Sequence, residues 1–437
     1  MRCARGLLFM VKGWRGEAPE RHSAPGRRGL LARRLTANAR TLAKNTDRPP
    51  ALTMERIYLD YNATAPLRHQ VREAMLRALD LPGNPSSVHG EGRAARRMID
   101  EARGLVARAL GADPRYVTFT SGGTEAANLV LSPSLKDGAG RVTDLIVSAG
   151  EHPCVLEGHR FPLERVHRAP VDDQGRLDLA ALEALLGQVG GRALVALQAA
   201  NNETGVIQPV AEAAALAHQA GGLLICDAVQ ALGRMEAGLA MLGADAVFVS
   251  AHKIGGPKGV GALAFARGDL HIEEALIRGG GQERGVRSGT ENPAGVAGFG
   301  AAAAVSSPDA VALARLASLR DGLESGLRQA FSDAVIFGAG APRLPNTSCF
   351  ALPGLQAETL LIALDLAGFA ISSGSACSSG KVRPSHVLEA MGVEAALSKC
   401  ALRVSFGYAT RESDVERFCE TFQKTVWTIR ERRGLRG

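Results

Sequence analysis

The 437-residue sequence has no apolar run that approaches the roughly 20 residues needed to cross a membrane as a helix. It also has no C-x-x-C pair, although it contains seven cysteines, at positions 3, 154, 226, 349, 377, 400 and 419. The missing pair argues against a zinc knuckle, and an odd cysteine count without a signal peptide argues against a disulfide framework. We therefore expect a soluble, intracellular protein in a reducing compartment, with no membrane partner.

Acidic residues are scarce at the start of the chain, where residues 1–50 contain 12 Lys or Arg but only 3 Asp or Glu. That segment carries a charge of +9, against +7 for the whole chain, so the remainder is close to neutral at −2. A near-neutral body gives little support for nucleic-acid binding. Tyr and Trp are also scarce, but 46% of the residues are hydrophobic, which is enough to fill a large core.

The Arg-rich segment over residues 1–53 differs in composition from the rest of the chain. It fits a mitochondrial transit peptide, a flexible tail, or upstream sequence translated from a start codon placed too early. We favour the last, because Met54 stands directly before a well-patterned stretch. We exclude residues 1–53 from the fold prediction and expect a cytoplasmic protein, or a mitochondrial one if the segment is a transit peptide.

Helical and strand periods alternate along the chain from residue 91 onward. Apolar runs of strand length are residues 144–149, 193–199, 222–228 and 245–251. Continuous apolar strands between helices predict an α/β fold with a mainly parallel sheet covered by helices. From about residue 306, helical segments surround short strands. We therefore expect a large domain over 54–305 and a smaller α+β domain over 306–437.

Polar residues follow five predicted strands, which are the four apolar runs and the short strand YVTFT over residues 116–120. The polar residues are the clusters SGGTE, EHPCV and NNETG, the pair Asp227 and Gln230, and the cluster SAHK. Ligands of parallel sheets bind beyond the carboxyl ends of the strands, which meet at one edge. We therefore expect these five groups to converge on one site.

Lys253 ends one of these strands, where a fixed amine can form a Schiff base. A single lysine is more often an exposed surface residue. However, Asp227 ends another strand, and enzymes that use pyridoxal 5'-phosphate need a carboxylate to pair with the pyridinium nitrogen. Gln230 is suited to donate to the ring hydroxyl, and His152 to stack on the ring. Lys258, in a Gly-rich turn, is the rival Schiff-base residue.

A phosphate group fits the start of the helix that follows SGG in the sequence. Gly123 and Thr124 offer backbone N–H groups, the positive end of the helix dipole and a hydroxyl group. Alone this signal is weak, because Gly-Gly-Thr turns also start ordinary helices. Together with the lysine, aspartate, glutamine and histidine, it supplies every contact that pyridoxal phosphate requires.

Cys377 stands in SSGSACSSG, where no bulky side chain can cover its sulfur. Structural cysteines usually lie among large aliphatic residues, so Cys377 is a nucleophile, a metal ligand or a small residue in a turn. We favour the nucleophile, since no partners stand at metal-ligand spacing. As a metal ligand, Cys377 would hold a transient iron–sulfur cluster shared with a partner protein. The other cysteines read as structural, with Cys154, close to His152, the one to watch.

The chain over residues 56–433 resembles the cysteine desulfurases of the NifS/IscS type, which belong to the class V aminotransferase superfamily. The matching stretches are YLDYNATAP, GNPSSVHGEGRAAR, TSGGTEAANL, EHPCVL, NNETGVIQPV, CDAVQALG, SAHKIGGPKGVGAL, GGGQERGVRSGTEN and SSGSACSSG. Nine stretches in order and at fitting spacings leave little room for coincidence. The resemblance implies a pyridoxal-phosphate-dependent transferase of fold type I.

The resemblance also implies a role for each site residue. Lys253 would form the Schiff base, Asp227 would pair with the pyridinium, Gln230 with the phenolic oxygen, and His152 would stack on the ring and move protons. The phosphate would be held by Thr124, Ser250 and His252, and by Thr290 reaching across a homodimer interface. Asn202 would contact the cofactor. Arg403 and Asn84 would hold the substrate carboxylate.

By the same resemblance, L-cysteine would be converted to L-alanine, and its sulfur would pass to Cys377 as a persulfide. An iron–sulfur scaffold or another sulfur carrier, such as one for tRNA thiolation, would then accept it. The rival functions are a selenocysteine lyase or a small-amino-acid aminotransferase on the same fold, and a catalytically silent partner. An aminotransferase needs no mobile thiol, and a silent partner predicts loss of Lys253, Asp227 or Cys377, which are all present.

Overall fold

The computed structural model describes residues 56–307, 309–373, 384–432 and 434 of the chain. Glu55–Gly437 forms one compact unit, divided from Met1–Met54. The predicted N-terminal extension and Cys377 therefore lie outside the described residues. Within the described ranges, no helix is long and apolar enough to cross a membrane, and no group of three or more His, Cys, Asp or Glu residues is arranged to hold a metal ion.

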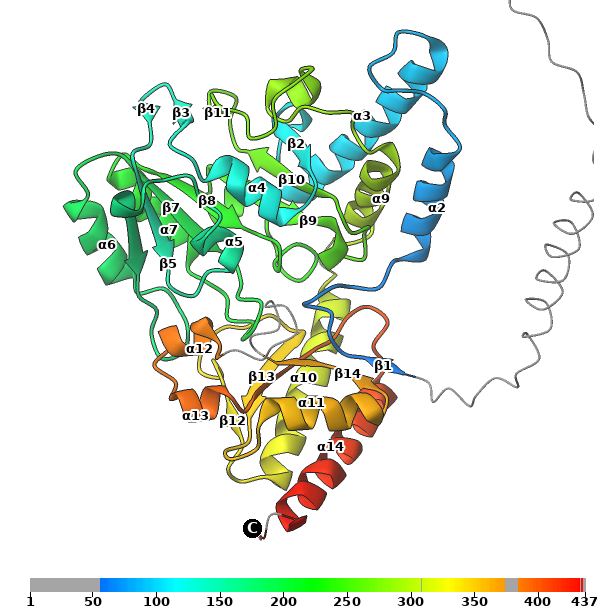
Figure 1. Cartoon of the computed structure of the whole chain (residues 1–437), viewed down its shortest axis with the longest axis vertical. Coiled ribbons are helices and arrows are strands. Elements are labelled where there is room, and N and C mark those ends of the chain that lie inside the picture. Colours follow the sequence, from blue (N-terminus) through cyan, green and yellow to red (C-terminus); the bar gives the residue numbers. More distant parts are fainter. Residues whose placement is uncertain (1–55, 308, 374–383, 433, 435–437) are drawn as a thin grey trace, which may run out of the picture. The chain divides into compact units, whose positions relative to one another are not determined.

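A seven-stranded sheet forms the centre of the larger part of the unit (Figure 1). Its strands, in spatial order, are β2 (Val117–Thr120), β10 (Gly261–Phe265), β9 (Ala246–Ser250), β8 (Leu223–Asp227), β7 (Ala193–Gln198), β5 (Asp144–Ser148) and β6 (Val166–Ala169). In this sheet, β10 alone runs in the direction opposite to the other six strands. The predicted mainly parallel sheet is therefore confirmed.

Helices cover both faces of this sheet (Figure 1). They include α2 (His69–Leu79), α3 (Gly90–Leu110), α4 (Gly123–Val130), α6 (Leu179–Gln188), α7 (Val210–Gln219) and α9 (Pro293–Ala304). Val195 and Leu224 point to one face and pack with side chains of α3, α7 and α9. Their neighbours Leu194 and Ile225 point to the other face and pack with α4. Burial on both faces explains why these strands are continuous apolar runs in the sequence.

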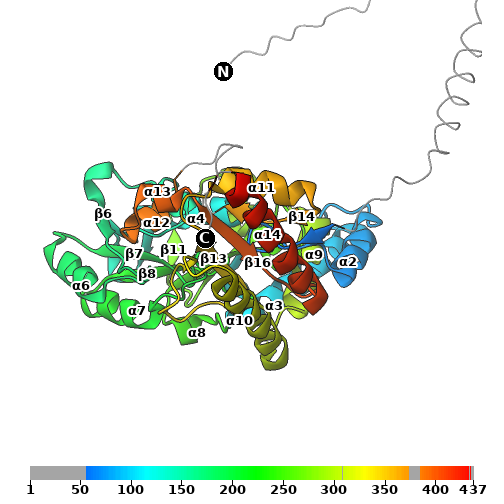
Figure 2. The ribbon, with the colours of Figure 1, turned by 90° about the horizontal axis from the view of Figure 1, so that it is seen from below.

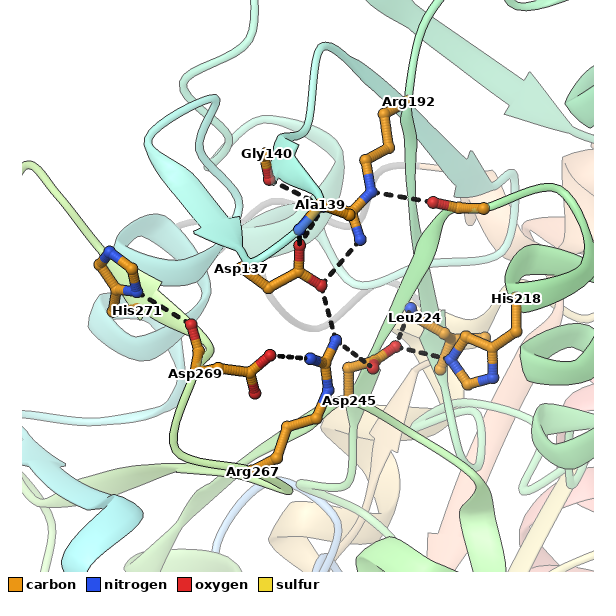
Figure 3. Close-up of polar contacts among 11 residues, drawn as sticks. Asp137, Ala139, Gly140, Arg192, His218, Leu224, Asp245, Arg267, Asp269 and His271 are labelled. Atoms are coloured by element: carbon orange, nitrogen blue, oxygen red, sulfur yellow. Dashed lines mark hydrogen bonds and ion pairs between the residues drawn. The ribbon is translucent and has the colours of Figure 1, made fainter.

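An ionic network ties together the amino ends of three parallel strands (Figure 3). Arg192, directly before β7, donates to both carboxylate oxygens of Asp137 at 2.6 and 2.8 Å, and Arg267 donates to the same carboxylate at 2.7 Å. Asp245, directly before β9, accepts from a backbone N–H of β8 and is hydrogen-bonded to His218, both at 2.8 Å. The hydrogen bonds from Arg192, and then from Arg267, hold the pKa of Asp137 well below its usual range. The carboxyl ends of the strands therefore lie at the opposite edge of the sheet.

The smaller part of the unit is built on an antiparallel sheet of four strands. In spatial order these are β12 (Val335–Ile336), β13 (Thr347–Ala351), β16 (Ala401–Ser405) and β15 (Ser372–Ser373). The helices α10 (Ala310–Ala330), α11 (Ala357–Leu366) and α14 (Glu412–Arg432) share a core with this sheet around Leu323, Phe350 and Phe422 (Figures 1 and 2). The short helix α12 (His386–Ala390) packs against Cys349 in a separate core.

The start of the described chain joins the smaller part of the unit. Strand β1 (Ile57–Tyr58) pairs in parallel with β14 (Phe369–Ala370), and Leu59 packs in the same core as Phe350. Directly afterwards, Asn62 and Ala63 reach the carboxyl edge of the seven-stranded sheet, as described below. The division at residue 305 stays a prediction, and the described chain crosses between the two parts at its beginning.

Candidate active site

A cavity of about 280 Å³ lies at the carboxyl edge of the seven-stranded sheet. The pairing of Gly261 with both Thr120 and Ser250 explains why distant strand ends meet here, because β10 begins between the ends of β2 and β9. The predicted site residues that line the cavity are Gly123, Thr124, His152, Asn202, Asp227, Gln230, Ser250, His252, Lys253 and Arg403.

Lys253 ends the short turn that follows β9. Its Nζ atom donates hydrogen bonds to the backbone carbonyls of Asn62 at 2.6 Å and Ala63 at 2.9 Å. These bonds fix the amine at the wall of the cavity. Lys258, the rival, lines a second and more open cavity that shares Thr124 and His252 with the first.

Asp227 is the last residue of β8 and is almost completely buried. Burial raises the pKa of this carboxyl to about 6, while the backbone N–H of Val229 and the charge of Lys253 act in the opposite direction. The N–H group of Val229 donates to Oδ1 at 2.9 Å. A cationic ring nitrogen in the cavity would add the favourable charge that a buried carboxylate needs.

His152 stands directly before the short helix α5 (Pro153–Leu156). Its Nδ1 atom accepts a hydrogen bond of 3.1 Å from the backbone N–H of Cys154. Burial lowers the pKa of His152 to about 4, and the positive charges of Lys253 and His386 act in the same direction. The ring is therefore neutral near pH 7, and its proton is on Nε2.

The start of α4 and the end of β9 form the part of the cavity that suits a phosphate group. Gly123 and Thr124 are the first two residues of α4, where backbone N–H groups lack partners within the helix. Ser250 ends β9, and the Nδ1 atom of His252 lies 3.2 Å from the hydroxyl of Thr64. Burial lowers the pKa of His252 to about 4, and nearby Lys and Arg charges add to this effect.

Arg403 enters the cavity from β16 in the smaller part. Its guanidinium pairs with Oδ1 of Asp60 at 2.7 Å and donates to the carbonyl of Asn202 at 3.0 Å. Its Nε atom is buried and has no hydrogen-bond partner among the described residues. A carboxylate in the cavity is the kind of ligand that would satisfy this donor.

Asn62 and Arg234 are the most informative of the residues at the site that the sequence did not predict. The carbonyl of Asn62 accepts from Lys253 and, at 3.1 Å, from Gln230. Arg234 is buried behind Gln230 and donates to its side-chain oxygen and to the carbonyl of Lys253. Asn62 lies in the matching stretch YLDYNATAP, but it follows no strand of the large sheet. The rule that ligands bind beyond the carboxyl ends of parallel strands, here called the strand-end rule, therefore did not select it.

The structure does not place two predicted residues at this cavity. Asn84 is exposed, and its side-chain oxygen accepts from the backbone N–H of Ser86 at 2.8 Å. Thr290 is also exposed and lines another cavity of about 140 Å³ with Phe119 and Ser121. Their contacts with substrate and with a second subunit stay predictions, as does the role of Cys377.

Comparison with known proteins agrees with the resemblance. The family model for class V aminotransferases matches residues 57–418. A cysteine desulfurase of Cereibacter sphaeroides is 43% identical over 86% of this chain and 97% of its own length. An IscS-like cysteine desulfurase of Mycobacterium tuberculosis is 38% identical over 84% of this chain and 96% of its own length. The crystal structure of a NifS-like protein from Rickettsia africae superposes with a TM-score of 0.77 at 35% identity, covering 85% of this chain and 99% of that one. The chain therefore belongs to the class V aminotransferase family, among the cysteine desulfurases of the NifS/IscS type.

Proposed function

We propose that the protein converts L-cysteine to L-alanine with pyridoxal phosphate as its cofactor and passes the sulfur to Cys377. One observation carries the proposal. Lys253, Asp227 and His152 line one cavity at the carboxyl edge of the sheet, in a chain 43% identical to a cysteine desulfurase.

The residues of the cavity fit the cofactor. Lys253 would be the residue to which it is attached, and buried Asp227 would pair with its ring nitrogen. The start of α4, with Thr124, would hold the phosphate. When bound, pyridoxal phosphate supplies an electron sink that makes the α-proton of an amino acid easier to remove.

The substrate would be oriented and deprotonated by side chains of the same cavity. Arg403 would bind its carboxylate, since its buried Nε atom needs an acceptor. The Nζ atom of Lys253 would take the α-proton, because this amine stands at the cavity wall. His152, neutral and with its proton on Nε2, would donate a hydrogen bond or a proton.

Sulfur transfer to Cys377 rests on the sequence. The thiolate would attack the sulfur of the substrate, so that an S–S bond forms and the Cβ–S bond breaks. The electron pair of the broken bond goes to the carbon skeleton, which takes a proton and leaves as alanine. The persulfide would then pass to an acceptor such as an iron–sulfur scaffold or a sulfur carrier. A cytoplasmic homodimer, with Thr290 reaching the partner's phosphate, belongs to the same proposal.

Alanine formation from L-cysteine with a thiol reductant tests the proposal. We expect turnover by the wild type and a loss of roughly a hundredfold or more in Lys253→Ala and Cys377→Ser. Lys258→Ala is the matched control and should keep its activity. If Cys377→Ser is as active as the wild type, or if selenocysteine is the one good substrate, a selenocysteine lyase is the better description.

A further inference from the structure

The first turn of α12 is bound to two buried acidic residues beside the cavity. The hydroxyl of Ser385, the residue before α12, donates to Oε2 of Glu203 at 2.5 Å. The Nε2 atom of His386 donates to the backbone carbonyl of Glu151 at 2.8 Å, because a carbonyl oxygen can only accept. Ser385, Glu203 and Glu151 are only 2%, 4% and 0% exposed, so water does not compete for these bonds.

Each of these acidic residues is next in the chain to a residue that lines the cavity. Glu151 directly precedes His152, and Glu203 directly follows Asn202. The side chain of Glu151 also accepts from the backbone N–H of Gln198 at 2.8 Å, and Gln198 lines the cavity as well. A displacement of α12 would therefore shift residues that are directly bonded in the chain to the cavity-lining residues His152 and Asn202.

The hydroxyl of Ser385 serves two elements at once. It also accepts from the backbone N–H of Leu388 at 3.1 Å and so caps α12, which fixes the direction in which it donates to Glu203. One hydroxyl therefore links the first turn of α12 to Glu203.

We propose that Ser385 and His386 are positioning residues of the reaction, which bind the start of α12 to the cavity wall and thereby hold His152 and Asn202 in place. The consequence for catalysis rests on the function proposed above. The positioning itself is a property of the folded chain and can be measured without the reaction. It also assigns α12, from the smaller part of the unit, to the support of residues of the larger part.

Hydrogen–deuterium exchange and steady-state kinetics of the full-length protein test this role. His386→Leu removes the donor, whereas His386→Gln keeps an N–H donor of similar reach. We expect His386→Leu to speed exchange in peptides covering residues 150–157 of the cofactor-free protein about fivefold or more, the factor of one lost hydrogen bond. In the holoenzyme it should lower kcat, and His386→Gln should restore both quantities.

Ser385→Ala and Ser385→Thr form a second pair that decides the question even if His386→Leu fails to fold. Ser385→Ala should speed exchange in peptides covering residues 200–206 and lower kcat, and Ser385→Thr should restore both. His69→Leu, a change at an exposed histidine of α2, is the control and should change neither.

The proposal is overturned if the Leu and Ala variants exchange and turn over like the wild type. It is equally overturned if His386→Gln is as impaired as His386→Leu, because packing volume rather than the hydrogen bond would then explain the loss. If the wild type forms no alanine at all, the proposed function fails, while exchange in the cofactor-free protein still decides whether the anchor exists.

Discussion

The backbone N–H of Cys154 donates to Nδ1 of His152 across 3.1 Å, so this ring nitrogen must carry a lone pair. Burial also lowers the pKa of His152 to about 4. We expect the ring to stay neutral, with its proton on Nε2, from about pH 5.5 to about pH 8. Nitrogen-15 NMR of histidine-labelled protein measures this directly, with His152→Gln to assign the signal. Titration of the His152 signal near pH 6.5 would contradict the assignment.

The two candidate lysines can be distinguished by where the cofactor is attached. We expect borohydride reduction of the holoenzyme, followed by peptide mass spectrometry, to place pyridoxal phosphate on Lys253. The reason is that Lys253 lines the cavity with Asp227, whereas Lys258 lines the more open neighbour. Lys258→Ala should still carry the cofactor, and label found on the Lys258 peptide of the wild type would reverse the assignment.

Glu203→Gln should change how stability depends on pH. Burial raises the pKa of Glu203 to about 7, against the opposing effects of the Ser385 hydrogen bond and the charge of Arg403. A raised carboxyl pKa means that the folded chain holds a proton which the unfolded chain has lost. The stabilisation is therefore complete below about pH 4.5 and is lost as the pH rises to about 7.

The glutamine variant has no proton to lose at this position. Its free energy of unfolding relative to wild type should therefore rise between pH 5 and pH 8, by an amount on the order of 3 kcal/mol or less. Denaturant unfolding at both pH values measures the difference. A difference that is constant with pH would show that Glu203 is already ionised at the lower pH in the folded protein.

The large sheet could be predicted because its strands are buried on both faces. The apolar runs at 193–199 and 245–251 became β7 and β9. Strand β10 was not predicted. Its sequence, GALAF, is short and rich in small residues, and its antiparallel place depends on pairing with β2 and β9, which are distant in sequence.

The part of the candidate site that lies at the carboxyl ends of the strands could be predicted from the strand-end rule. That rule placed Lys253 and Asp227 together because Asp227 ends β8 and Lys253 lies in the turn directly after β9, at the same edge of the sheet. It carries no information on contacts between distant segments. The pair of Arg403 and Asp60 joins residues 343 positions apart, and the contact of His386 with Glu151 spans 235 positions. The first pair lies within the smaller part and the second joins the smaller part to the larger. Both depend on tertiary packing, which local patterns do not encode.

The proposed function depends on the transfer of sulfur from L-cysteine to Cys377. The most direct measurement is peptide mass spectrometry of the holoenzyme after a single addition of L-cysteine without reductant, with thiols blocked at once. We expect one extra sulfur atom on the peptide that contains Cys377, formed together with alanine and absent in Lys253→Ala. Alanine formed with no extra sulfur on Cys377, or with the sulfur on Cys154 instead, would contradict it.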